Sequence, residues 1–414
     1  MLPSFSLAER DRRYASVRAL MAERELDVLV VPAGDGADTQ ANARYLSQIG
    51  GNGAWVVLPA TGEATAFLPS DSGVRMWSEH LTWPSDLRVG VPSMAVPERL
   101  RELGLARGRI GIAGLQGQFG RPEGIIPHET WRRITRALPE AAFVPAAGVL
   151  DTARQVKGEE EVAVIERVAI ANEAAVSRMF DVARPGVEER IVWREMNDTL
   201  IRCTEEYPSR LLLGSNGRPA NAGNSLPLPI AMEDGGVLSQ EVAARLQGYQ
   251  AQSNHSILVG TRNARYEEAM RDAIAVFEGL RGWVAPGRSL AEMAAETRRL
   301  LAEVGGTFAG GPFIHTNGLG ADRPRFGPNG SVQATGADPM EDTELVIEVG
   351  WTFTIKAGVT LGDMTAQVGS PVTVTAAGAR RLGSRALVPY STGGSNAAAG
   401  SGQAAALTPF RTTL

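Results

Sequence analysis

The sequence predicts an α/β N-terminal domain followed by an α+β C-terminal domain with an internal duplication. Two observations carry this prediction. Strand-length apolar runs and helical patterns share the first 150 residues, and a helix, a Pro-Gly pair, a second helix and strand-like segments occur twice after that point. We expect domains at residues 1–150 and 151–390, with a flexible tail rich in Gly, Ala and Ser at residues 391–414.

The N-terminal domain combines helical and strand patterns. Residues 11–32 predict an amphipathic helix followed by a buried strand that ends at a proline. Residues 54–58 and 64–68 predict two strands joined by a turn-rich connection, which favours a hairpin. A further βα unit is expected over roughly residues 85–150. These elements together indicate an α/β domain.

The C-terminal domain begins with a long helix whose apolar face is interrupted by one polar residue, Asn172. That helix ends at Pro185-Gly186, and a second long helix ends at Pro286-Gly287. Ser289 and Glu292, after the second Pro-Gly pair, have the spacing of a capping box and predict the start of another helix. Because strand-like segments follow each copy, we expect a duplicated unit.

Composition excludes several classes of function. In a chain of 414 residues, 43% are hydrophobic and 21% charged, which is typical of soluble globular proteins. The charge of -5 and the scattered basic residues leave no stripe for phosphates, so no nucleic acid is expected. No segment predicts a secretion signal or membrane span, so no membrane contact is expected. The single Cys203 excludes an intrachain disulfide and favours a cytoplasmic location.

Several common catalytic motifs are absent. The Gly-rich tracts lack a following Gly-Lys-Ser/Thr, and no Gly-x-Gly-x-x-Gly opens a helix after a strand. No Gly-x-Ser-x-Gly elbow is present either. We therefore expect no nucleotide and no other cofactor.

Strand alternation selects polar residues that share a face. In the segment 250–256 the even positions carry amides and a hydroxyl, so Gln252 and Asn254 are expected to line a site. His255 points away from this row and is expected at the surface or in a second layer.

A second polar row lies on the strand predicted around residues 351–356. Thr352, Thr354 and Lys356 share one face of that strand, and apolar residues share the other. The pattern alone fits a half-buried strand whose lysine faces solvent equally well.

Two further side chains are candidates for chemistry. His315 is the best general acid or base, because an imidazole exchanges protons near neutral pH, although a histidine that braces the preceding loop fits the same pattern. Arg323 or Arg325 is a candidate for binding a substrate carboxylate through two hydrogen bonds, although loop arginines are more often inert.

The order of these segments resembles the pita-bread family that includes creatinase, aminopeptidase P and prolidase, over nearly the whole chain. Five motifs in family order carry the resemblance: Asn42-Ala43-Arg44-Tyr45-Leu46, which looks like a family turn, Gly248-Tyr249, His315 to Gly320, Gly350 to Lys356, and Val372 to Gly378. The resemblance implies a creatinase-like α/β N-terminal domain, a pita-bread C-terminal domain and a homodimer.

Metallopeptidases of this family hold two divalent ions through two aspartates, a histidine and two glutamates. By the resemblance, these positions fall on Glu241, Gln252, His315, Lys356 and Gly369, with Gln367 two residues before the last. Asn317 is the alternative to His315. An ammonium group at Lys356 repels a dication and pairs well with Glu241, so we expect a buried ion pair and no metal at these positions.

The resemblance is closest in character to the metal-free creatinase-like members. Because Asn221 stands where creatinase relies on a histidine, creatine itself is not the expected substrate. We expect a metal-independent hydrolase that cleaves a C–N bond of a small polar nitrogen compound. The expected catalytic residues are His315, Glu241 and Lys356, and the expected substrate-binding residues are Gln252, Asn254, Asn221, Asn317, Arg323 and Gln367.

Two alternatives stay open. The chain is either a non-catalytic binding protein that kept the pita-bread fold, or a metal-dependent Xaa-Pro aminopeptidase or dipeptidase. The second alternative requires a rearranged site that uses Asp322, Asp363 or His315.

Overall fold

The structure is a computed structural model. It describes residues 5–34, 36, 38–51, 53–116, 124–218, 220, 227–308, 314–320, 325–326 and 345–393. The described residues form two compact units, the first comprising residues up to Glu160 with Leu319 and Gly320, and the second the others. Within this described part, no helix has the length and apolar character needed to cross a membrane.

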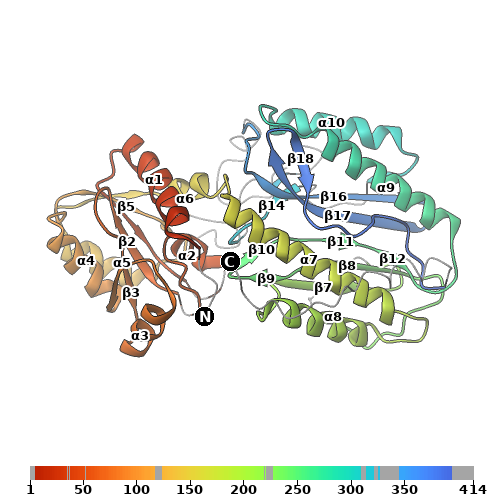
Figure 1. The fold of residues 1–414 in the computed structure, drawn as a ribbon, viewed down its shortest axis with the longest axis horizontal. Helices are drawn as coiled ribbons and strands as arrows, with labels where there is room; N and C mark the ends of the chain where they lie inside the picture. Colours follow the sequence, from red (N-terminus) through yellow and green to blue (C-terminus); the bar gives the residue numbers. More distant parts are fainter. Residues whose placement is uncertain are drawn as a thin grey trace. The chain divides into compact units, whose positions relative to one another are not determined.

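The first unit contains a six-stranded sheet with helices on both faces (Figure 1). Its strands are β1 (Val28–Val31), β2 (Trp55–Pro59), β3 (Thr65–Leu68), β4 (Asp86–Val89), β5 (Arg109–Ile112) and β6 (Ala142–Pro145), in the order β4-β3-β2-β1-β5-β6. Its helices are α1 (Leu7–Glu23), η1 (Asp38–Gln40), α2 (Ala41–Ser47), α3 (Asp71–His80), α4 (Pro92–Glu102), α5 (His128–Ala137) and α6 (Ala147–Ala153). Antiparallel pairing of β2 with β3 confirms the predicted hairpin.

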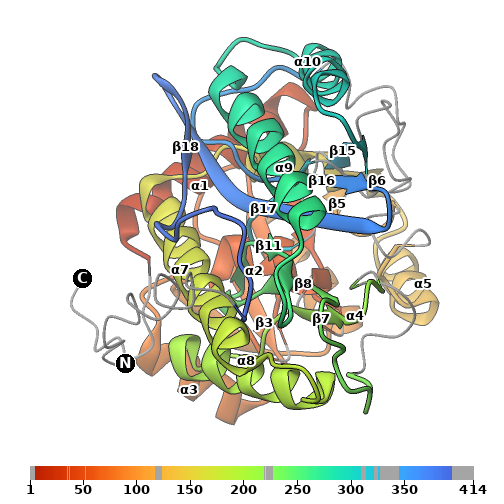
Figure 2. The same cartoon turned by 90° about the vertical axis from the view of Figure 1, so that its right-hand side faces the viewer.

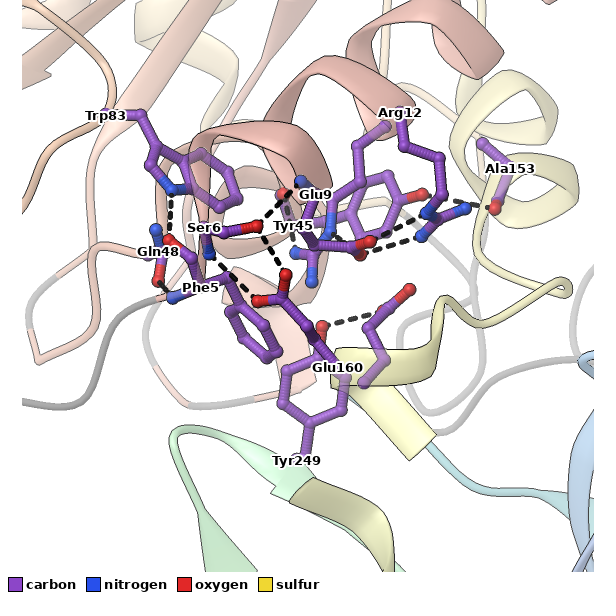
Figure 3. Close-up of polar contacts among 12 residues, drawn as sticks. Phe5, Ser6, Glu9, Arg12, Tyr45, Gln48, Trp83, Ala153, Glu160 and Tyr249 are labelled. Carbon is purple, nitrogen blue, oxygen red and sulfur yellow. Dashed lines mark hydrogen bonds and ion pairs between the residues drawn. The ribbon is translucent and has the colours of Figure 1, made fainter. Parts of the chain in front are cut away.

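The N-terminal helix α1 is fixed at its start by polar contacts (Figure 3). The Ser6 hydroxyl caps the helix by accepting the Glu9 backbone N–H at 3.1 Å, and the Ser6 backbone N–H donates to Glu160 at 2.9 Å. Just before the helix, the Phe5 carbonyl accepts the indole N–H of Trp83 at 3.0 Å. The helix therefore begins at Leu7, four residues before the predicted start.

The second unit contains a larger set of strands with helices packed against them. Its helices are α7 (Glu159–Val182), α8 (Glu189–Thr204), α9 (Ala264–Trp283) and α10 (Leu290–Glu303). Its strands are β7 (Arg210–Gly214), β8 (Val237–Ala243), β9 (Arg245–Leu246), β10 (Tyr249–Gln250), β11 (Asn254–His255), β12 (Ile257–Leu258), β13 (Thr307–Phe308), β14 (Ile314–Thr316), β15 (Arg325–Phe326), β16 (Thr352–Leu361), β17 (Met364–Thr375) and β18 (Gly378–Arg381).

Most of the polar residues that the sequence singles out lie on β8, β11, β14, β16 and β17. The order β11-β17-β16-β14-β15 forms the main sheet, and β12-β8-β7 forms a smaller one. The two sheets meet where Val242, on β8, pairs with Ser253, just before β11. Helix α9 packs against β16 and β17, and α8 packs against β7 (Figure 2). This arrangement brings β8, β11, β16 and β17 together.

The predicted duplication is present. Helices α7 and α8 flank the first Pro-Gly pair, and α9 and α10 flank the second. The Ser289 side chain accepts the Glu292 backbone N–H and the Glu292 carboxylate accepts the Ser289 N–H, so the predicted capping box is formed.

Two local predictions are wrong, and one is incomplete. The segment Asn42 to Leu46 lies in helix α2 and is not a turn. The region around residues 85–150 contains the expected βα unit but holds three strands in all. Two of them are short edge strands of half-exposed residues whose pattern is too weak to predict. Ser391 and Thr392 are buried and bonded to the segment 258–260, so the predicted tail does not begin at Ser391; residues 394–414 lie outside the described residues.

Candidate functional site

The predicted ion pair between β8 and β16 is present. Lys356 Nζ lies 3.2 Å from Glu241 Oε1, and each side chain is 15% exposed. Arg210, on the neighbouring strand β7, donates to the other carboxylate oxygen, Oε2, at 3.1 Å. Both oxygens of the Glu241 carboxylate are therefore engaged by cationic side chains.

The charge state of Glu241 follows from this environment. Burial by itself raises the pKa of the Glu241 carboxyl group, but the positive charges of Lys356 and Arg210 outweigh it and hold this pKa below its ordinary value. Glu241 is therefore ionised at neutral pH. A carboxylate with a lowered pKa is a poor base, so this geometry suits the placement of Lys356 better than the activation of water.

A second group of contacts connects the segment before β11 to the end of β14. Asn317 Oδ1 accepts the Gln252 backbone N–H at 3.4 Å and lies 3.0 Å from Thr354 Oγ1. The Thr354 hydroxyl also lies 2.8 Å from the Gln252 carbonyl oxygen. Thr354 and Lys356 share one face of β16, so this amide group adjoins the ion pair.

Asn254 lies on the other side of Lys356. Together with Glu241, Lys356, Thr354, Asn317 and Gln252 it forms what we call the polar layer. Its Nδ2 donates to the Gln240 carbonyl at 3.1 Å, and its backbone pairs with Gly369 on β17. Gly369 in turn lies opposite Lys356. A Cβ on Gly369 would lie 3.1 Å from both Asn254 Oδ1 and Lys356 Cγ, so a side chain at this position would crowd both groups.

His315 and Gln367 lie on the strands that flank this layer. His315 is buried on β14 directly opposite Thr354 of β16. Its side chain therefore lies on the same face of the sheet as Thr354 and Lys356. Gln367 is half-buried on β17, on the same strand face as Gly369, and its backbone N–H donates to Ser256 Oγ at 2.8 Å. Asn221 and Arg323, the other two predicted substrate-binding residues, lie outside the described residues.

Three buried amide atoms in this layer have no hydrogen-bond partner among the described residues. They are Gln252 Nε2, Asn254 Oδ1 and Asn317 Nδ2. The three residues are 6%, 4% and 1% exposed, so solvent does not compensate these atoms.

The donor set does not fit a pair of divalent ions. Glu241 is the one carboxylate among the positions matched to metal ligands, and an ammonium group contacts it. Across the described residues, no group of three or more His, Cys, Asp or Glu side chains is arranged to hold a metal ion. Neutral amides with one paired carboxylate are poor ligands for ions that prefer several anionic oxygens.

Sequence patterns missed two contributors to this layer. Arg210 follows a loop and gives no signal that it reaches Glu241. Asn172, on α7, donates to the Ala251 carbonyl at 2.8 Å and accepts the Ala244 N–H at 2.7 Å, so it fixes both segments that flank Gln252 and β8. Its position as the one polar interruption of an apolar helix face was the available signal.

Of the two expected positions for His255, the surface or a second layer, the structure shows the second. Its side chain is buried and does not lie at the surface, its Nε2 lies 3.1 Å from the Val388 carbonyl oxygen, and its ring lies 4.9 Å from that of Tyr390. Burial lowers the pKa of His255 well below its ordinary value, and the charge of Arg385 lowers it further. His255 is therefore neutral in the folded protein.

Two family models match the chain. Metallopeptidase family M24 matches residues 163–376, slightly more than half of the chain, and the creatinase/prolidase N-terminal domain matches residues 13–156.

Solved structures with the same fold include a Xaa-Pro dipeptidase from Bacillus anthracis, with a TM-score of 0.75, 17% identity and coverage of 92% of this chain and 99% of that chain. The prolidase from Pyrococcus horikoshii has a TM-score of 0.72 and 18% identity, with 91% and 99% of the two chains covered. Dipeptidase PepE from Mycobacterium ulcerans has a TM-score of 0.73 and 20% identity, with 94% and 100% covered.

A curated relative, the uncharacterized peptidase YqhT from Bacillus subtilis, is 21% identical over 246 residues, or 58% of this chain. The matched part spans 65% of that relative's length.

Proposed function

Because the chain belongs to metallopeptidase family M24, we propose that it is a hydrolase that cleaves an amide-type C–N bond in a small polar substrate. The observation that carries the proposal is the layer in which the Glu241–Lys356 pair adjoins the buried amides of Gln252, Asn254 and Asn317. Family membership supports a peptidase-like reaction, and the buried amides support a polar substrate.

The proposed reaction needs no divalent ion. Lys356 supplies a fixed positive charge where the family places a metal ligand, and Glu241 holds that charge in position at 3.2 Å. A dication close to Lys356 would be repelled, and the available ligands are mostly neutral.

The described side chains have distinct roles in this proposal. Lys356 and the unpaired N–H group of Asn317 stabilise negative charge that develops on the substrate oxygen when a water adds to the carbonyl carbon. His315 accepts a proton from that water as it adds, and transfers this proton to the leaving nitrogen as the C–N bond breaks, so that the products are a carboxylic acid and an amine. Glu241 positions Lys356, which revises its expected role as a base because its pKa is lowered.

A metal-dependent Xaa-Pro peptidase is the second candidate. The fold shared with a Xaa-Pro dipeptidase and a prolidase favours it. The described residues do not supply its ligand set, so this candidate requires ligands that lie outside them.

One assay separates these functions. We would incubate the protein with a panel of dipeptides, Xaa-Pro dipeptides, primary amides and lactams, with EDTA or with added manganese, and detect products by mass spectrometry. Turnover that persists in EDTA and disappears in His315→Ala supports the proposal. Turnover of Xaa-Pro peptides only with manganese supports the second candidate, and binding without any turnover indicates a non-catalytic protein.

A further inference from the structure

We infer that the ligand of this site presents an uncharged amide that carries both a C=O group and an N–H group. The inference rests on the proposed function, because it assigns a substrate class to the same layer of residues. It depends on two buried asparagines, Asn254 and Asn317, whose amide orientations are both fixed by backbone neighbours.

Asn254 offers an acceptor. Its Nδ2 donates to the Gln240 carbonyl oxygen, which can only accept, so the opposite orientation of this amide would place two oxygens together. Asn254 Oδ1 is thereby directed toward the Gly369 and Lys356 side of the layer, where a Cβ on Gly369 would approach it to 3.1 Å. This oxygen has no partner among the described residues and therefore calls for a donor from the ligand.

Asn317 offers a donor. Its Oδ1 accepts the Gln252 backbone N–H, which can only donate, so this amide is also fixed in one orientation. Its Nδ2 has no partner within the described part of the chain and calls for an acceptor. Gln252 Nε2 is unpaired as well, but no contact of the Gln252 side chain fixes which way its amide faces.

The two groups belong to one continuous layer. Asn317 contacts Thr354, which shares the face of β16 with Lys356; Lys356 lies opposite Gly369, and Gly369 pairs with Asn254. A buried acceptor and a buried donor without partners destabilise the protein, so a ligand that pairs with both gains affinity by removing this penalty.

This pairing discriminates among ligand classes. Ionised carboxylates offer acceptors alone and leave Asn254 unpaired, whereas ammonium and guanidinium groups offer donors alone and leave Asn317 unpaired. A tertiary amide, including an Xaa-Pro bond, has a C=O but no amide N–H. Primary and secondary amides, including lactams, offer an acceptor for Asn317 and a donor for Asn254.

The test compares matched ligands that differ only in the amide N–H. Ala-Ala is compared with Ala-(N-methyl)Ala, and 2-pyrrolidone with N-methyl-2-pyrrolidone, by ligand-observed NMR on the full-length wild-type protein, with ligand signals followed for turnover. We expect at least one pair to show about tenfold tighter binding of the N–H compound, as for the loss of one buried hydrogen bond. Equal affinities within both pairs, or no binding of any of the four, would overturn the inference.

Two variants assign the effect to the asparagines. Asn254→Ala removes the acceptor, so the N–H preference disappears. Asn317→Ala weakens both members of a pair equally and keeps their ratio. A preference for the N–H compound that survives Asn254→Ala overturns the inference. If a variant does not fold, the ratio of the two affinities measured on the wild-type protein still decides.

The failure of this inference is distinguishable from that of the proposed function. N–H-selective binding without hydrolysis of any amide supports the inference and overturns the function. Hydrolysis of an amide without N–H-selective binding supports the proposed function and overturns the inference.

Discussion

Glu241 is ionised because two cations share its carboxylate, and the charge of Lys356 lowers its pKa more than the charge of Arg210 does. Lys356 is buried beside it, whereas the Arg210 side chain is 43% exposed and more strongly screened by water. The identity of the dominant partner can be measured.

We predict that Lys356→Met raises the pKa of Glu241 more than Arg210→Met does. Removal of Lys356 leaves the effect of burial, which raises the pKa, opposed by one screened charge. The measurement is a carboxyl-detected NMR titration of both variants and the wild type. An equal or larger rise in Arg210→Met would show that the Lys356 contact does not control the charge state.

A second residue-scale prediction concerns His255. The ordinary pKa of histidine is 6.5, and the folded protein holds that of His255 well below this value. Below about pH 6.5 the unfolded chain therefore binds a proton at His255 that the folded chain does not bind. As the pH is lowered, the free energy of unfolding falls by up to about 1.4 kcal/mol for each pH unit.

Urea unfolding between pH 5 and 7 measures this slope. His255→Phe is expected to lose the His255 contribution to the slope, and the exposed His128→Gln to keep it. A wild-type slope retained in His255→Phe would contradict the assignment.

Residue identity predicted part of the site. Alternation alone placed Thr352, Thr354 and Lys356 on one face, since a strand has a period of two. The bond from Thr354 to Asn317 joins residues 37 apart, and the Arg210 contact joins residues 31 apart. Such contacts depend on how separate strands are brought together, and a local pattern does not contain that information.

At the scale of elements, α7 contacts both segments that flank the site through the side chain of Asn172. Asn172 is fully buried and bonds to the backbone of Ala244 and Ala251, which lie on either side of the β9–β10 hairpin. The 24-residue helix α7 therefore fixes both β8, which carries Glu241, and the segment that carries Gln252.

We predict that Asn172→Ala lowers the free energy of unfolding by about 2 to 4 kcal/mol, because it leaves a buried N–H and a buried C=O without partners. The matched control is Asn263→Ala, which removes the cap of α9 at a partly exposed helix end. Water replaces the cap bonds there, so about 1 kcal/mol is expected. Equal losses in chemical unfolding would mean that Asn172 does not clamp the two segments.

Elements with local signals were predicted well. The capping box of Ser289 and Glu292 acts over three residues and is formed as its spacing predicts. Helix α2 was missed because its seven residues are too few to show a period, and the edge strands β4 and β6 lack buried apolar runs.

At the scale of the whole molecule, the fold and the chemistry of the site are two separate questions. The family models and the related structures establish the fold of a peptidase family. Among the positions that the sequence resemblance assigns to that family's ligands, Glu241 is the one carboxylate, and it pairs with Lys356. A shared fold does not transfer a metal centre when its ligands are replaced.

We predict that divalent ions do not stabilise the protein. An ion bound at a hundred times its dissociation constant would add about 2.7 kcal/mol to the free energy of unfolding. Thermal unfolding in EDTA and in millimolar manganese, cobalt or zinc is therefore expected to give the same midpoint. A reproducible upward shift with one of these ions would reveal a site formed by other residues.

The most direct measurement is the metal content per protomer, by elemental mass spectrometry, after expression with added manganese, cobalt, iron and zinc and purification without chelators. An amide-lined site with a Glu241–Lys356 pair predicts no stoichiometric metal. One or more equivalents of a single ion would contradict this account and favour the metal-dependent peptidase.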